Sequence, residues 1–224
     1  MKKLLIFLMI CELILLPTGC HANPPKNSAQ SPSKNEKPTS TDNTPEEAIE
    51  GLLRSLQHQN FSGAKKYYVE NFDNMANFHN QLEDISPTVA NQFFSKLADF
   101  SYSIENTSID SNTPSKATAY ITMNYYDVGK AFETTLLEYM KNDISMTYDG
   151  KKDDDISKKA DEIITEVLDK SSKETLSHIP VSLVLEDSNW KVTKISENPE
   201  LLNALTGNIV KTIEKLITTI HNTK

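Results

Sequence analysis

The stretch Ala117-Thr118-Ala119-Tyr120-Ile121-Thr122-Met123-Asn124-Tyr125 places small or apolar side chains at every second position. Successive side chains of a β-strand point to opposite faces, so this stretch predicts a strand with one apolar and one polar face. Residues 100–105 alternate in the same way, and a turn over residues 111–114 separates the two segments. We therefore predict an antiparallel hairpin that packs one of its faces on a core.

A second hairpin is predicted nearer the end of the chain. Its first strand is marked by alternating apolar residues, namely Ile179, Val181, Leu183 and Leu185. Residues 187–189 then turn the chain, and Trp190 and Val192 open a return strand whose register is expected to shift by Ile195. Because each strand is apolar on one side, we expect a curved four-stranded antiparallel sheet with helices over its apolar face.

The folded part is predicted to begin at residues 44–47, Thr-Pro-Glu-Glu. Thr44 can cap a helix, proline suits the first helical position, and Glu47 completes a capping box. After a break at Gln59-Asn60, a second helix is expected from about Ser62, and it carries Ala64, Tyr67 and Tyr68. These two helices are predicted to form a helical hairpin.

Further helices are expected on both sides of the second hairpin. Ser86-Pro87 predicts a helix start, and residues 128–141 and 153–172 predict two helices between the hairpins. From Pro199 onward the chain is again predicted helical, with one apolar side made of Leu202, Leu205, Ile209, Ile213, Leu216 and Ile220. The predicted fold class is α+β: N-terminal helices packed on the sheet, a helical insertion at about 128–175, and a C-terminal helix.

The first 43 residues are predicted to precede this domain. Residues 1–19 start with two lysines after Met1 and continue as an apolar run too short for a stable membrane span, which is typical of a signal peptide. Pro17-Thr18-Gly19-Cys20 ends the leader and resembles the lipobox of bacterial lipoproteins. That resemblance implies cleavage between Gly19 and Cys20, with a diacylglycerol on the Cys20 thiol. Residues 20–43 are rich in Pro, Ser, Asn and Lys, and we expect a disordered tether there.

The alternative to a lipid anchor is an ordinary signal peptide cleaved after Ala22, which would give a secreted protein. Pro17 stands where lipoboxes usually carry Leu, and Glu12 interrupts the apolar run. The cysteine content favours the lipid, because Cys11 and Cys20 are the two cysteines of the chain and none remains for a disulfide or a cysteine metal site. We expect the protein on the extracytoplasmic face of the cell membrane, held by the lipid on Cys20.

The charge of the chain argues against nucleic acid as a partner. The formal net charge is −8, and removal of the leader, with two lysines and one glutamate, makes it −9. Arg54 is the single arginine, so the clustered cations that bind a phosphate backbone are missing from the sequence. The six glycines form neither a phosphate loop nor a dinucleotide fingerprint.

Three segments of the domain resemble the nuclear-transport-factor-like cone domains. Residues 44–49 together with 60–67 are similar to the opening of such domains, and residues 181–192 are similar to their closing hairpin. Residues 201–207 resemble the tail of uncharacterised Gram-positive lipoproteins of this class. The resemblance implies a cone-shaped α+β fold, and the class includes enzymes such as ketosteroid isomerase.

The resemblance to cone domains implies that side chains can line a concave space beneath the sheet, because such domains often leave one there. The candidates are aromatic residues that are alternatively plain core: Tyr67, Phe93, Tyr102, Tyr125 and Trp190. Asp99, Glu105 and Asp127 are candidate carboxylates, but Glu105 belongs to the polar face and the other two to strand ends.

Neither a metal nor a cofactor is expected. The four histidines after the tether show no short ligand spacing: His58, His79, His178 and His221. The acidic cluster that includes Asp149 and residues 153–155 lacks the spacing of a calcium loop and suits a helix start.

The sequence therefore predicts a non-enzymatic, lipid-anchored envelope protein that binds a small ligand, a peptide or another envelope protein. One alternative is an enzyme of the isomerase or hydratase type, which requires a buried carboxylate or histidine at an open cavity. Another is a structural partner in an envelope complex, with an exposed apolar stripe from Ile209 to Ile220 as its interface.

Overall fold

The structure is a computed structural model that describes residues 42–134, 137–138, 162, 165–166, 168–169 and 171–222. The predicted signal peptide, Cys20 and all but the end of the predicted tether lie outside the described residues. The same holds for most of the predicted helical insertion and for its acidic cluster. Residues 128–134 at the start of that insertion are helical, as predicted.

The sheet has four antiparallel strands in the order β1-β2-β3-β4. Their bounds are Ser101–Ile109, Lys116–Tyr126, Lys173–Glu186 and Asn189–Val192. Asp187 and Ser188 join β3 to β4 with positive φ angles of 50° and 63°, the conformation that a two-residue hairpin turn requires. The α+β fold with a four-stranded antiparallel sheet is confirmed.

The prediction for the return strand was wrong beyond Val192. Residues Ile195–Glu197 form a 3-10 helix, η2, instead of continuing β4 with a shifted register. Asn198 explains the difference, because its side-chain oxygen accepts a 2.7 Å hydrogen bond from the Ser182 amide of β3. The Asn198 side chain thus provides the acceptor for β3 that a longer β4 backbone would have provided.

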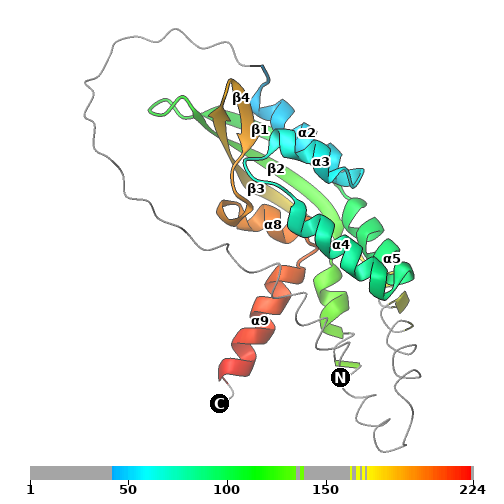
Figure 1. Ribbon diagram of the computed structural model, residues 1–224. Coiled ribbons are helices and arrows are strands. Elements are labelled where there is room, and N and C mark those ends of the chain that lie inside the picture. The colour runs from blue at the N-terminus through cyan, green and yellow to red at the C-terminus, as the bar shows by residue number, and fades with distance from the viewer. Residues whose placement is uncertain are drawn as a thin grey trace, which may run out of the picture.

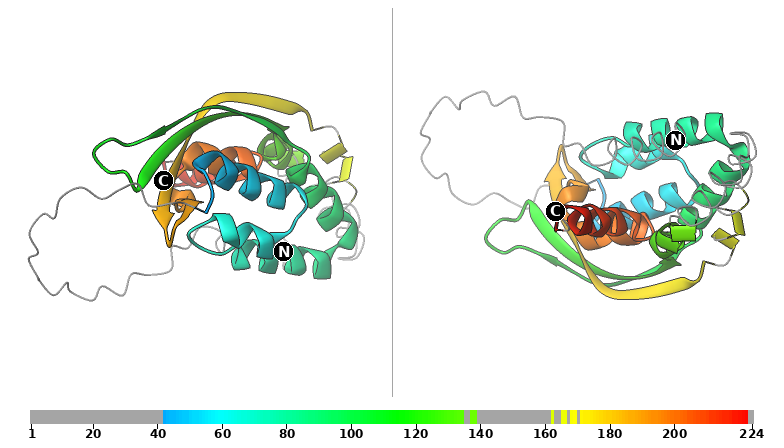
Figure 2. Two further views of the ribbon diagram at one scale, coloured as in Figure 1. Left: turned by 90° about the horizontal axis from the view of Figure 1, so that it is seen from above. Right: turned by 90° about the horizontal axis from the view of Figure 1, so that it is seen from below.

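Helix α2, Pro45–Gln57, begins with the predicted capping box. Thr44 Oγ1 accepts from the Glu47 amide at 3.2 Å, and Glu47 Oε2 accepts from the Thr44 amide at 2.8 Å. Its buried face consists of Ala48, Ile49, Leu52 and Leu53 and packs against the apolar side of the sheet. In Figure 2 the sheet arches over α2 and over α8, Pro199–Leu205.

The second helix is much shorter than predicted. Helix α3 covers Phe61–Ala64, the 3-10 helix η1 covers Lys65–Tyr67, and Tyr68 forms a parallel bridge with Val192 of β4. The chain leaves the helix because Tyr68 is drawn into the core beside β4, where its hydroxyl accepts a 2.9 Å hydrogen bond from the Ile195 amide. Burial there raises the pKa of Tyr68 to about 12.

Two helices that precede the sheet pack on each other through aromatic side chains. Helix α5, Pro87–Ala98, begins at the predicted proline, although the Ser86 side chain makes no capping bond. Helix α4, Asp73–Ile85, was not predicted. The Phe78 ring lies 5.8 Å from the rings of both Phe93 and Phe94, measured between centroids.

The C-terminal segment is two helices rather than one. Helix α8 ends at Leu205, and α9 covers Ile209–Asn222. Gly207 and Asn208 between them have positive φ angles of 54° and 62°, which end the first helix. The Gly129 amide donates a 2.6 Å hydrogen bond to the Gly207 carbonyl, so the helix at 128–134 packs against this break.

The core has two parts. One lies between the sheet, α2 and α8; the other joins α4, α5, the helix at 128–134 and α9. Figure 1 shows α4, α5 and α9 at the end of the molecule away from β4. Ile209 and Ile213 are 8% and 7% exposed and belong to the second part, so the prediction of an exposed stripe was wrong for these two residues. The side chain of Ile220 is outside the described part of the structure.

Candidate functional site

The two faces of the sheet differ in what they offer a ligand. The inner face of β2 is filled by Ala117, Ala119, Ile121, Met123 and Tyr125, all at most 5% exposed. Among the described residues, the buried polar or charged ones are Ser86, Asn198, Thr206 and Thr212. The described core beneath the sheet therefore contains neither a buried carboxylate nor a buried histidine.

The five candidate aromatic residues do not gather around one cavity. Tyr125 and Trp190 are buried beneath the sheet, and Tyr67 and Tyr102 lie half-buried at the edge of that cluster. Phe93 belongs to the second core cluster, with α4 and α9. The Tyr125 hydroxyl contacts Asn208 Oδ1 at 3.4 Å, and burial raises the pKa of this tyrosine. Their described surroundings are those of packing residues.

Two of the candidate carboxylates have structural partners at strand ends. Asp99 follows α5 and accepts a 2.7 Å hydrogen bond from Lys173 Nζ at the start of β3. Asp127 follows β2 and accepts a 3.0 Å hydrogen bond from the Lys130 amide, which caps the helix at 128–134. Neither carboxylate faces the described core.

Glu105 lies on the outer face of the sheet, as its position in the alternation predicted. Its Oε1 accepts from Thr122 Oγ1 at 2.6 Å and from the His178 amide at 3.2 Å, and its Oε2 contacts His178 Nδ1 at 3.1 Å. One carboxylate thereby joins β1, β2 and β3. The hydrogen bonds from Thr122 and His178 lower the pKa of Glu105.

These contacts coincide with two irregularities in the strand register. The β1–β2 pairing skips Glu105, and the β2–β3 pairing shifts between Ile121 and Met123, so that both bulges lie beside Thr122. His178 has a φ of 60°, a conformation that costs energy for a side chain other than glycine. The Glu105 contacts offset that cost and stabilise the bend of the sheet.

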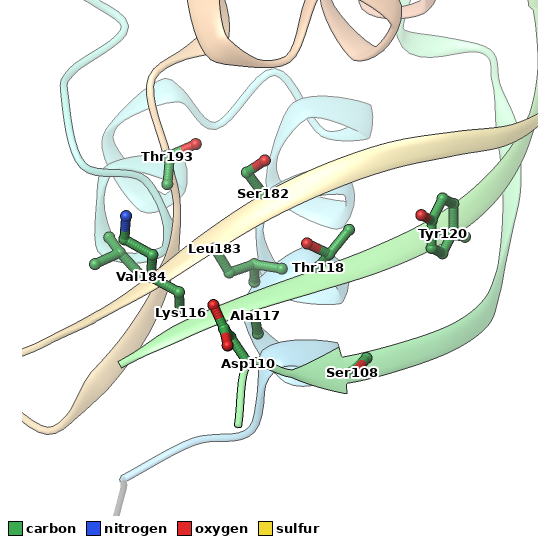
Figure 3. Close-up of a pocket in the computed structure, with 10 residues that line it drawn as sticks. All are labelled: Ser108, Asp110, Lys116, Ala117, Thr118, Tyr120, Ser182, Leu183, Val184 and Thr193. Carbon is green, nitrogen blue, oxygen red and sulfur yellow. The ribbon is translucent and has the colours of Figure 1, made fainter. Parts of the chain in front are cut away.

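The outer face also contains an open depression of about 570 Å³ between β1, β2 and β3 (Figure 3). Seven of its ten lining residues are polar: Ser108, Asp110, Lys116, Thr118, Tyr120, Ser182 and Thr193. The other three are Ala117, Leu183 and Val184. Its volume is that of a small-molecule site, ~300–1,000 Å³, but its lining is far more polar than usual.

Sequence reasoning missed this depression, because it directed attention to the inner face. The alternation did place Thr118 and Tyr120 on the polar side of β2. Ser182 and Thr193 come from the other hairpin, and nothing local in the sequence shows that they lie beside Thr118. A row of hydroxyl side chains on the polar side of both hairpins was the available signal.

The described histidines and acids do not form a metal centre. Within the described residues, no three His, Cys, Asp or Glu side chains gather where they could hold a metal ion. Glu105 and His178 meet as a pair, and His79 contacts Glu83 Oε2 at 3.8 Å. Of the helices in the described parts of the chain, none combines the length and apolar character needed to cross a membrane.

Comparisons with known proteins identify no relative of this chain. No protein-family model, no curated protein and no solved structure matches this sequence or its fold. The resemblance to cone domains therefore remains an expectation from the sequence segments that carry it.

Proposed function

We propose that this chain is a lipid-anchored protein of the extracytoplasmic face of the bacterial cell membrane, and that its folded domain binds a ligand without catalysing a reaction. The observation that carries the proposal is Cys20, placed between an apolar leader and a polar stretch. A thioether-linked diacylglycerol on this residue supplies the membrane anchor. The domain beyond the tether then faces the outside of the cell.

The start of the domain is consistent with a tether that ends beside the sheet. Asn43 Oδ1 accepts from the Trp190 amide at 2.6 Å, and Asn43 Nδ2 donates to the Trp190 carbonyl at 3.1 Å. The Asp42 amide also donates to the Ser188 carbonyl at 2.8 Å. These hydrogen bonds attach the chain to β4 and its turn before α2 begins. A force on the tether would therefore act on the sheet.

A binding role agrees with the groups that the domain offers. The described core lacks a buried acid or base to run a proton transfer, whereas the outer face carries an open, polar depression. We therefore prefer binding over the isomerase or hydratase alternative.

The anchor is tested by labelling the protein with a palmitate analogue in a Gram-positive bacterial host. Wild type is expected to incorporate the label, and its mature N-terminus is expected to be a lipid-modified Cys20 by mass spectrometry. Cys20→Ala should lose the label completely, because the thiol is the attachment point. Cys11→Ala is the matched control and should label as wild type does, since this cysteine is removed with the leader.

Two results would contradict the anchor. One is an unlabelled wild-type protein whose mature N-terminus is Asn23, which is the product of cleavage after Ala22. The other is equal labelling of wild type and Cys20→Ala, which would place the lipid elsewhere.

A further inference from the structure

The depression on the outer face presents hydroxyl groups that the fold itself does not use. The side-chain hydroxyls of Ser108, Thr118, Tyr120 and Ser182 make no hydrogen bond with other described residues, and all four line the depression. Figure 3 shows them on β1, β2 and β3, around one hollow. In contrast, Leu183 and Ala117 belong to the buried core. Four hydroxyls from three strands therefore line the same depression and are available to a ligand.

The aromatic ring at one end of this hollow is held in place. The Tyr120 ring stacks on the His178 ring at 4.1 Å between centroids, with an interplanar angle of 11°. His178 is in turn held by Glu105 through its amide and its Nδ1. Tyr120 thus loses little further freedom when a ligand binds, which favours affinity.

The charged groups at the depression balance one another. Asp110 and Lys116 are both exposed and flank the β1–β2 turn, and Asp110 Oδ1 accepts a 2.8 Å hydrogen bond from the Asn112 amide. One carboxylate and one ammonium give the lining no net charge, so a multiply charged ligand gains little here. The polar lining also disfavours a lipid or another apolar ligand.

We propose that this depression binds an oligosaccharide of neutral or amino sugars. A sugar hydroxyl both donates and accepts, as the serine, threonine and tyrosine hydroxyls do, so the two sets can pair throughout. The C–H faces of a sugar ring can pack on Tyr120 and Val184, which are half-buried here. The inference names the ligand class of the proposed binding domain and does not depend on the lipid.

The test is saturation-transfer difference NMR on the full chain in phosphocholine micelles, which contain no sugar headgroup. The probes are the trimer of N-acetylglucosamine and maltotriose, each titrated to obtain a dissociation constant. At least one is expected to receive saturation from the protein. Tyr120→Ala and Thr118→Val should each weaken binding, by about tenfold for the loss of an aromatic contact or a hydrogen bond.

Ser103→Ala is the matched control, because Ser103 is an exposed β1 residue that pairs with Thr122 outside the depression. It should bind as wild type does. Ser108→Ala provides a second lining variant at an exposed position, in case Tyr120→Ala does not fold, and circular dichroism verifies folding of each variant. Absence of saturation with both sugars, or equal affinity in the lining variants and the control, would overturn the inference.

The proposed anchor and the proposed sugar site are tested by separate measurements, so either one can be contradicted without the other. A chain that carries no palmitate label but binds a sugar contradicts the anchor alone. A labelled chain that binds neither sugar contradicts the sugar site and leaves the anchor standing.

Discussion

The side chain of Asn198 supplies the hydrogen-bond acceptor for β3 at the point where β4 ends. Its side chain is 1% exposed, accepts from the Ser182 amide, and donates to Thr193 Oγ1 at 3.1 Å and to the Lys194 carbonyl at 3.0 Å. Pro180 comes next on β3 in the same alternation, and it has no amide hydrogen to satisfy. On this side of β3, the Ser182 amide is thus satisfied by the Asn198 side chain, and Pro180 has no amide hydrogen that needs a partner.

Asn198→Ala is expected to lower the free energy of unfolding by about 2–3 kcal/mol, because it leaves the half-buried Ser182 amide without its acceptor and removes the side-chain hydrogen bonds to Thr193 and Lys194. Urea denaturation of the two proteins measures the difference. Asn203→Ala is the control, since it removes the same group from a half-buried position of α8 and should change stability by less than about 0.5 kcal/mol. Equal stability of the two variants would show that the edge does not depend on Asn198.

Glu105 makes the stability of the sheet depend on pH. Its pKa is lower in the folded protein than the ordinary value of 4.5. Its contribution is therefore fully present above the unfolded pKa and is lost as the pH falls through the folded pKa. Glu105→Gln should lower the melting temperature at pH ~7 and lower it less at pH ~3, because a larger share of the wild-type carboxylate is protonated as the pH falls toward its lowered pKa.

Thermal melts of wild type and Glu105→Gln at the two pH values measure this difference. Glu174→Gln serves as the control, because Glu174 is an exposed residue of β3 outside the contacts with His178. A deficit in Glu105→Gln that is the same at both pH values would show that the carboxylate charge does not hold the bend.

At the scale of elements, helix starts were predictable where a side chain or a proline marks them. Thr44 and Glu47 form their capping box from neighbours three residues apart, so the sequence contains the whole interaction. Helix α4 follows Phe72, which makes no side-chain cap, and its start was missed. Its half-buried Met75 and Phe78 and its buried Leu82 are held by packing against α5 and the second core cluster.

The break between α8 and α9 is an element-scale feature that depends on a glycine. Gly207 has a φ of 54°, and a Cβ there would lie 2.5 Å from the Tyr126 carbonyl oxygen. Gly207→Ala should lower the free energy of unfolding by about 2–3 kcal/mol, from backbone strain and from this clash. Chemical denaturation measures it.

Asn208→Gly is the comparison for that variant. Asn208 also has a positive φ, of 62°, but glycine adopts this conformation freely. The substitution loses a long 3.4 Å contact with the Tyr125 hydroxyl and should change stability much less than Gly207→Ala does. If Gly207→Ala were as stable as wild type, the helix break would not require glycine.

At the scale of the whole molecule, the sheet divides the domain into a packed side and an open side. The inner face is filled by α2 and α8, so the five aromatic residues that were candidates for a cavity lining contribute to two core clusters instead. On the outer face, the described structure holds an open depression, and the bend of the sheet is held by contacts among β1, β2 and β3. Under the proposed anchor, this face would be presented outside the cell.

The amino-acid sequence by itself determined the strands, their apolar faces, the α+β class and the start of α2. Each of these depends on periodicity or on contacts between near neighbours in the chain. The tertiary structure alone decided where β4 ends, how the C-terminal helix breaks and which hydroxyls share a hollow. Ser182 meets Asn198, and Thr118 lies near Ser182, through hydrogen bonds between distant segments, and local periodicity contains no information about such pairings.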